Sequence, residues 1–296
     1  MSAIDDFVLR PADFSYVGSG LRSPECTIAE VDGTLWISDD RGGVIRLAPD
    51  GRRALIGSIA GKPNGIAMDR QGDLLVADIA GGKVYRLFRD GSHEVIVEAL
   101  SGTPLGAVNF VLIDRRDRLW ITVSTRTNPY ADAVRTPIPD GYIIRLDGDE
   151  PQIVAQGICF TNELRIDAAE RFVYVAETAL GRVLRLPLSP DGSVGPAETF
   201  GPPRLFDGAL IDGITFDEEQ NLWVTELTRN AIAVIAPDGS SRIVFEDPAG
   251  ETLLSPTSIS FGGSDRRTAC VGSLKMNRLA TFRVPIAGQR LAHWCD

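Results

Sequence analysis

Short apolar runs separated by turn residues recur along almost the whole chain. In one copy, a first strand-like segment begins with Thr161-Asn-Glu and ends at Asp167, and a second, mostly apolar segment ends at Glu177. Runs of this length, bounded by Asp, Gly and charged residues, are typical of β-strands joined by tight turns. The pattern therefore predicts a strand, a turn and a second strand in each copy.

The copies number six and keep one register. In each copy the first strand begins at an equivalent residue, which we call the anchor: Glu25, Asn64, Asn109, Asn162, Asp212 and Ser258. Eleven residues after each anchor lies a second-strand residue, in order Trp36, Leu75, Trp120, Val173, Trp223 and Ala269. Successive anchors are 39 to 53 residues apart, which is the period of four-stranded propeller blades.

The remainder of each copy supplies outer strands. A third strand is expected at residues 43–47, 83–87, 142–146, 182–186 and 231–235. Most of these strands end in a tight turn with an Asp-Gly pair, and such pairs favour hairpin turns because glycine accepts a positive φ. Long helical periodicity is absent from the sequence. We predict an all-β, six-bladed β-propeller with four-stranded blades, spanning residues 1–296 as a single domain.

The last copy contains only three clear strands, at residues 258–261, 269–272 and 279–284. Residues 1–23 precede the first copy and hold two short apolar runs, at 7–10 and 14–17. A strand from this segment would cover the open edge of the last sheet, which is otherwise an aggregation hazard. We expect the amino-terminal segment to close the ring.

Composition changes this picture mainly by exclusion. The chain has 30 basic and 40 acidic residues, so nucleic acid and anionic membranes are not expected partners. It lacks an apolar run near the roughly 18 residues of a membrane span, and its acidic start lacks secretory features. We expect a cytoplasmic monomer or weak homo-oligomer that acts on a small molecule. The four cysteines lack metal-ligand spacing and are expected to be reduced: Cys26, Cys159, Cys270 and Cys295.

The anchors carry the candidate chemistry. The first strands of a propeller line its central channel, so the six anchors converge on one axis with two carboxylates, three amides and a hydroxyl. The carboxylates of Glu25 and Asp212 would repel each other there, and a cation would relieve the repulsion. Oxygen ligands suit a hard cation, and we expect one divalent ion, Ca²⁺ foremost, with Zn²⁺, Mg²⁺ and Mn²⁺ as alternatives.

Other chemistries have little support. The two histidines, His93 and His293, lie beside a hairpin turn and near the carboxyl terminus, so neither a His-rich zinc site nor a Ser-His-Asp triad is expected. There is also no P-loop or dinucleotide fingerprint. Metal-assisted chemistry remains.

Several local motifs resemble a known family across nearly the whole chain. They are Ser23-Pro-Glu25, Asn109 before Ile113-Asp114, Phe160-Thr-Asn162, Ile211-Asp-Gly213, and Pro256-Thr-Ser with Phe261-Gly-Gly263. These resemble the six-bladed propellers of the regucalcin (SMP-30), gluconolactonase and luciferin-regenerating enzyme group. The resemblance implies that Glu25, Asn162 and Asp212 bind a divalent metal and that Asn109 binds metal or substrate.

The resemblance also implies an activity. Enzymes of this group open lactones or hydrolyse related esters, with the metal polarising the carbonyl, which makes Asp212, or else Glu25, the candidate base. The remaining candidate substrate contacts are Asn64, Asn109, Phe110, Arg126, Glu163 and Ser258. Alternatives are a non-catalytic ligand- or protein-binding propeller, and a metal-dependent phosphotriesterase or cyclase on the same scaffold.

Two departures from the family pattern bear on the substrate. Sugar-lactone members often carry Arg and Asp where this chain has Ala107 and Phe110, so we expect a less polar lactone or ester than gluconolactone. The fourth-blade Asn is commonly followed by Gly, but here by Glu163, which we expect to pair with Arg165.

Two further features concern the face that carries the anchors. The segment 124–140 between second and third strands is unusually long, and we expect a lid over the site, with a packed insertion as the alternative. The second strands end in acidic residues on this face, of which at least half should serve as turn caps: Asp39, Asp78, Glu177 and Glu226.

Overall fold

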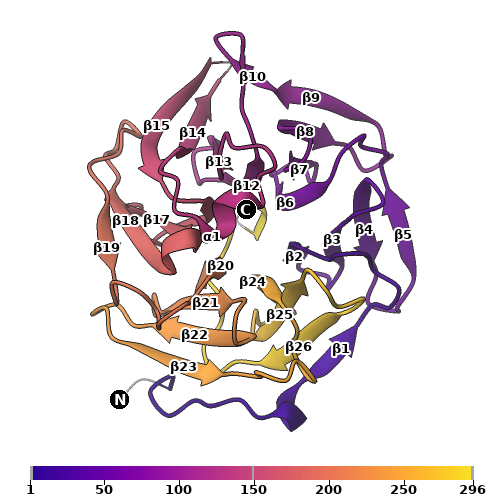
Figure 1. The fold of residues 1–296 in the computed structure, drawn as a ribbon. Helices are drawn as coiled ribbons and strands as arrows, with labels where there is room; N and C mark the ends of the chain where they lie inside the picture. Colours follow the sequence, from indigo (N-terminus) through magenta and orange to yellow (C-terminus); the bar gives the residue numbers. More distant parts are fainter. Residues whose placement is uncertain (1–2, 149, 295–296) are drawn as a thin grey trace.

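Six four-stranded antiparallel sheets form a ring in the computed structural model, which describes residues 3–148 and 150–294 (Figure 1). In blades 1 to 5 the strands are paired in chain order, and each first strand contacts the first strands of the neighbouring blades. The first strands therefore line the central channel. The predicted six-bladed β-propeller is confirmed.

The blades have the following strands. Blade 1 contains β2 (Thr27–Ala29), β3 (Leu35–Asp39), β4 (Gly43–Leu47) and β5 (Arg53–Ile56). Blade 2 contains β6 (Pro63–Met68), β7 (Leu74–Asp78), β8 (Lys83–Leu87) and β9 (His93–Val97). Blade 3 contains β12 (Val108–Ile113), β13 (Leu119–Val123), β14 (Gly141–Asp147) and β15 (Glu150–Ile158). Blade 4 contains β16 (Thr161–Ile166), β17 (Phe172–Glu177), β18 (Arg182–Pro187) and β19 (Glu198–Phe200). Blade 5 contains β20 (Ile211–Phe216), β21 (Leu222–Glu226), β22 (Ala231–Ile235) and β23 (Ser241–Phe245).

Blade 6 closes the ring with both ends of the repeat array. It contains β24 (Pro256–Gly262), β25 (Thr268–Ser273), β26 (Leu279–Arg283) and β1 (Ser15–Val17). The register places Ser15 opposite Thr281 and Val17 opposite Leu279. The expected amino-terminal strand is thus confirmed, and it covers the outer edge that β26 would otherwise expose.

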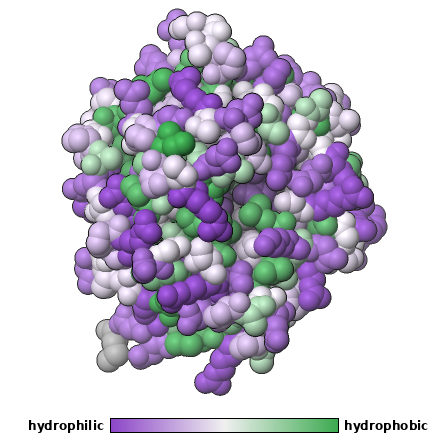
Figure 2. Space-filling view, viewed as in Figure 1, coloured by the Kyte–Doolittle hydropathy of each residue, from purple (hydrophilic) through white to green (hydrophobic). Residues whose placement is uncertain are grey.

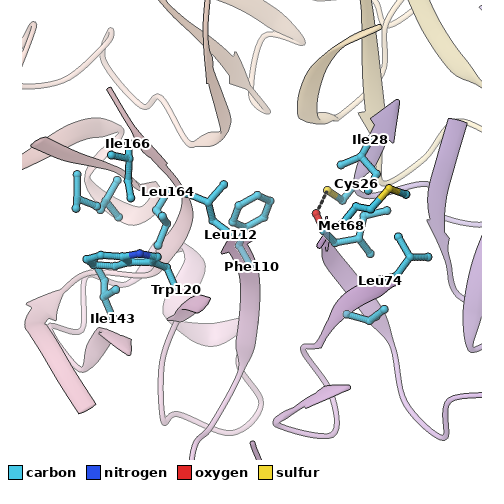
Figure 3. Close-up of a cluster of buried hydrophobic side chains, with 14 of the residues drawn as sticks. Cys26, Ile28, Met68, Leu74, Phe110, Leu112, Trp120, Ile143, Leu164 and Ile166 are labelled. Atoms are coloured by element: carbon cyan, nitrogen blue, oxygen red, sulfur yellow. Dashed lines mark hydrogen bonds between the residues drawn. The ribbon is translucent and has the colours of Figure 1, made fainter. Parts of the chain in front are cut away.

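Tryptophans of the second strands fill the space between blades. Trp36, Trp120 and Trp223 are almost completely buried, and each indole N–H donates to a carboxylate in the turn after the first strand. Figure 3 shows the Trp120 ring between Ile143 of its own blade and Leu164 of the next. The pairing satisfies the one polar group of a large apolar side chain.

The structure contains only short helices among the residues it describes: η1 (Pro11–Asp13), α1 (Asp132–Arg135), η2 (Thr178–Leu180) and η3 (Ala292–Trp294). None of the described helices has the length and apolar character needed to span a bilayer. A small hairpin, β10 (Ala99–Leu100) and β11 (Thr103–Pro104), connects blades 2 and 3. Cys26, Cys159 and Cys270 are buried and free, as expected, whereas Cys295 lies outside the described residues.

Candidate metal and active site

Irregularities in the first strands place the anchors. In blades 2 to 6 the pairing of the first with the second strand shifts register across the anchor, as between Thr161 and Leu164 around Asn162. Such β-bulges re-aim side chains and are over-represented beside active sites. Blade 1 differs, because Glu25 lies two residues before β2 begins.

In the odd-numbered blades, hydroxyl groups of the second strand hold the backbone next to the anchor. The backbone N–H that follows the anchor donates to Ser38 in blade 1, to Thr122 in blade 3 and to Thr225 in blade 5, at 2.8 to 3.0 Å. Sequence reasoning missed these residues, although a signal existed. Each hydroxyl lies two residues after a second-strand tryptophan, in a Trp-x-Ser/Thr pattern.

All six anchors are buried, with at most 6% of any one exposed. The amide of Asn64 donates to the Asn109 backbone oxygen at 3.0 Å and lies 3.3 Å from Asn109 Oδ1 and 3.5 Å from Glu25 Oε1. The amide of Asn162 donates to Thr178 Oγ1 at 3.0 Å, so its carbonyl oxygen is left for another partner. The predicted convergence of the anchors is therefore observed for Glu25, Asn64 and Asn109 by direct contact.

Three anchor oxygens are left without partners. Glu25 Oε2, Asn162 Oδ1 and Asp212 Oδ1 are buried and accept no hydrogen bond from any described residue. Buried polar atoms are nearly always satisfied, so three such oxygens on one channel need an explanation. Two carboxylates and an amide are ligands that a hard divalent cation prefers, so these residues fit such an ion. Among the described residues no group of three or more His, Cys, Asp or Glu is arranged to hold a metal ion.

The electrostatics agree with this donor set. Burial raises the pKa of Glu25 to about 7, although the positive charge of Lys62 opposes the shift. Burial raises the pKa of Asp212 well above its ordinary value, and the charges of Glu25 and Glu163 add to the shift. Ionised carboxylates are thus unfavourable here without a counter-charge, which a cation would supply.

Other predicted site residues occupy different positions. Ser258 Oγ accepts the backbone N–H of Thr27 at 3.2 Å and so joins blade 6 to blade 1. Phe110 is 3% exposed, and its ring lies against the Arg165 guanidinium. Arg126 stacks on Tyr142 and lines a cavity of about 460 Å³ between blades 2 and 3, which no anchor lines. The structure does not bring Arg126 together with the anchors.

The segment from residue 124 to 140 contains a helix and is held in place by side-chain packing. α1 packs against η2, and the buried Ala133 belongs to a cluster with Cys159, Phe160 and Ala179. Asp140 Oδ2 accepts the backbone N–H of Arg126 and the hydroxyl of Thr125, both at 2.9 Å. These contacts are those of a packed insertion, which was our alternative interpretation. A lid function stays a prediction. Figure 1 shows α1 near the centre of the ring, and Figure 2 shows a hollow near the centre of the same face.

The acidic residues that end the second strands all accept backbone N–H groups. Asp39 and Asp78 accept backbone N–H groups from the loops beside them. Glu177 accepts the Cys159 N–H, and Glu226 accepts those of Leu210, Thr228 and Arg229. The capping interpretation therefore holds for Asp39, Asp78 and Glu226, in agreement with the prediction that at least half of the set caps turns, whereas Glu177 does not cap the helix that follows it.

The carboxyl-terminal tail covers the opposite end of the channel. Gln289 donates to the Ile166 carbonyl, and Trp294 Nε1 donates to that of Ala29, both at 2.9 Å. Above the tail lies a cavity of about 30 Å³, and Figure 3 shows Phe110 and Leu112 on one side and Met68 on the other. Sequence reasoning did not predict this closure.

Comparison with known proteins gives one family. The family model described as the SMP-30/Gluconolactonase/LRE-like region matches residues 23–275. A 6-deoxy-6-sulfogluconolactonase from Pseudomonas putida is 26% identical over 227 residues, covering 76% of this chain and 70% of that protein.

Solved structures show the same fold at low sequence identity. A gluconolactonase from Xanthomonas campestris superimposes with a TM-score of 0.76 at 20% identity, covering 94% of each chain. A regucalcin from Agrobacterium tumefaciens, described as a calcium-binding protein, also has a TM-score of 0.76, at 17% identity, covering 98% of this chain and 97% of its own. These likenesses carry the fold alone.

Proposed function

Because this chain belongs to the SMP-30/gluconolactonase/LRE-like family, we propose that it is a divalent-metal-dependent hydrolase that opens a lactone. The observation that carries the proposal is the set of three buried, unpartnered oxygens on Glu25, Asn162 and Asp212. A scaffold for protein binding has no need to leave two carboxylates and an amide unpaired in its channel. An enzyme that needs a cation does.

The chain's residues divide the work as follows. Glu25, Asn162 and Asp212 would hold the cation, and Asn109 would complete the set or contact the substrate. When bound, the cation, Ca²⁺ foremost, would polarise the lactone carbonyl and stabilise the negative charge that develops on its oxygen. Asp212 would accept a proton from the attacking water. The water oxygen bonds to the carbonyl carbon, the ring C–O bond breaks, and the leaving oxygen regains the proton to give a hydroxy acid.

The substrate we propose is a lactone with fewer hydroxyl groups than gluconolactone. Ala107 precedes the third-blade anchor by two residues and is 5% exposed, so it offers no donor for a sugar hydroxyl. Phe110 is directed away from solvent and likewise offers none. A substrate with many hydroxyl groups would leave some of them without hydrogen-bond partners here, which would lower its affinity.

The test combines metal content with activity. Purified protein is assayed for bound calcium and zinc, then tested on aliphatic lactones, gluconolactone, an aryl ester and a phosphotriester, before and after chelation. We expect metal-dependent opening of the aliphatic lactones and a loss of about 100-fold or more in Asp212→Asn, because the candidate base is removed. The exposed Asp207→Asn serves as the matched control and should keep full activity.

Two results would contradict the proposal. Full activity in Asp212→Asn would remove that residue from the chemistry. A wild-type protein that binds no divalent cation and opens no lactone would favour the binding propeller, and turnover of the phosphotriester alone would favour the phosphotriesterase.

A further inference from the structure

Glu163 occupies an unusual place next to the candidate metal site. It follows Asn162 in the same β-bulge of β16. The equivalent residues of blades 2 and 5 are glycines, and a Cβ added there would lie 2.6 Å from Phe110 Cα at Gly65 and 2.5 Å from the Thr257 oxygen at Gly213. Blade 4 instead accommodates a full carboxylate side chain, whose Oε2 accepts the Ile214 N–H of blade 5 at 3.2 Å.

Arg165 is the counter-ion of this carboxylate. Its Nη2 lies 3.0 Å from Glu163 Oε2, and the two side chains are 8% and 4% exposed. Arg165 Nη1 donates to the Leu164 carbonyl, and its guanidinium lies 4.6 Å from the centre of the Phe110 ring. The expected ion pair is therefore present, and it is buried in the channel.

Stability alone does not account for this pair. Removing two charges from water is costly, and apolar residues of similar volume are commonly as stabilising as a buried ion pair. The glycines of blades 2 and 5 show that the fold needs no carboxylate at this position of the bulge. A charged pair kept in a water-poor channel therefore points to a functional effect.

The effect that fits is electrostatic. Glu163 lies close enough for its charge to act on both Glu25 and Asp212, the two carboxylates of the candidate metal site. A divalent cation with these two carboxylates is neutral, and Glu163 with Arg165 adds one charge of each sign. A third carboxylate strengthens the attraction for a cation in a medium of low dielectric, and the arginine offsets it.

We propose that Glu163 is a positioning residue that strengthens divalent-cation binding at Glu25, Asn162 and Asp212, and that Arg165 moderates this effect. The inference rests on the metal site of the proposed function. It assigns a role to a residue pair where the family pattern has a glycine. It also makes a prediction of opposite sign for the two partners, which a purely structural ion pair does not make.

The experiment measures cation affinity directly. Chelator-stripped wild type, Glu163→Gln, Arg165→Gln and the double variant are titrated with Ca²⁺ by calorimetry at about pH 8.5, above the pKa of about 7 to which burial raises Glu25 and Glu163. Glu163→Gln keeps the side-chain shape and an acceptor for the Ile214 N–H, and we expect its affinity to fall about 10-fold or more. Arg165→Gln should bind the cation more tightly than wild type, and the double variant should fall between the two single variants.

The outcomes separate the two levels of the argument. Equal weakening in both single variants would mean that the pair only supports the fold, and unchanged affinity in Glu163→Gln would also overturn the inference. A wild-type protein that binds no divalent cation would overturn the proposed function itself. Circular dichroism checks folding, and if Arg165→Gln does not fold, unchanged cation affinity in Glu163→Gln still overturns the inference.

Discussion

The two ends of the central channel are lined by the same six first strands, yet their polar groups are used differently. At the anchor end, oxygens of Glu25, Asn162 and Asp212 are buried and unpartnered among the described residues. At the opposite end, the carbonyls of Ala29 and Ile166 accept hydrogen bonds from the carboxyl-terminal tail. Carboxylate and amide oxygens of the described residues are therefore left unpartnered at the anchor end, whereas the tail supplies donors to backbone carbonyls at the other end.

The difference has an energetic side. Each buried oxygen without a partner costs about 1 to 3 kcal/mol, so the anchor end lowers the stability of the metal-free protein. The tail end adds stability, because it removes apolar surface from water and satisfies backbone carbonyls. The same type of substitution should therefore have different effects at the two ends. At the anchor end it should mainly lower activity, and at the tail end it should mainly lower stability.

The largest expected effect comes from replacing one amide at each end by leucine. Asn162→Leu should lose about 100-fold or more in kcat/KM, because an oxygen of the candidate metal site disappears. Gln289→Leu should keep activity close to wild type and lose about 1 to 2 kcal/mol of stability with its hydrogen bonds to Ile166 and Gln220. Steady-state kinetics on the best lactone and urea unfolding provide the measurements. Similar losses of activity in both variants would erase the distinction between the ends.

A smaller effect is expected on thermal stability. Saturating divalent cation at about 100 times its dissociation constant should stabilise the wild type by about 2.7 kcal/mol, because it binds only the folded site. This corresponds to a rise in Tm of roughly 4 to 5 °C for a chain of this length, measured by calorimetry with and without chelator. The cation should not raise the Tm of Asn162→Leu. Trp294→Ala should have a lower Tm than wild type but should show the same rise when the cation is added. A rise that persists in Asn162→Leu would place the cation elsewhere.

The smallest effect concerns pH at the tail end. Burial lowers the pKa of His293 below 6.5, although its contact with the Ala29 oxygen and the charge of Glu30 oppose the shift. The folded protein therefore favours the neutral ring, so the stability from burying this ring is full above pH 6.5 and is lost as the pH falls below that value. Urea unfolding between about pH 5 and 8 should show that the free energy of unfolding decreases by roughly 1 kcal/mol or less on the acidic side. His293→Gln should lack this component, and an unchanged pH profile in that variant would show that His293 does not cause it.

The periodicity of the sequence was sufficient to predict the fold. Alternating apolar runs with Asp-Gly turns specify strands and hairpins locally, and the six-fold repeat specifies blades, because each blade must bury its faces against equivalent neighbours. The missing fourth strand of the last copy likewise required a partner from residues 1–23, and Ser15–Val17 supplies it. The helix α1 escaped prediction because four residues carry too little periodicity to be read.

The candidate site was only partly accessible from the sequence. The anchors could be aligned, so the convergence of six oxygen-bearing residues on one axis followed from their shared register. The choice of Glu25, Asn162 and Asp212 as metal ligands came from the resemblance to the family. The placement of Arg126 did not follow, because its direction depends on how the segment from 124 to 140 packs against blade 4. The hydrogen bonds of Ser258 also depend on contact between blades 6 and 1, which no local pattern encodes.

By itself, the sequence determined the number of blades, the register of the anchors and the chemical types that face the axis, because strand period and turn residues act over short distances along the chain. Only the tertiary structure decided which oxygens remain unpaired, since that depends on bulges and on partners such as Thr178 that come from other segments. It also decided that the tail covers one end of the channel. Long-range packing sets these contacts, so carboxylate and amide oxygens of the described residues stay unpartnered at one end while the tail packs against the other.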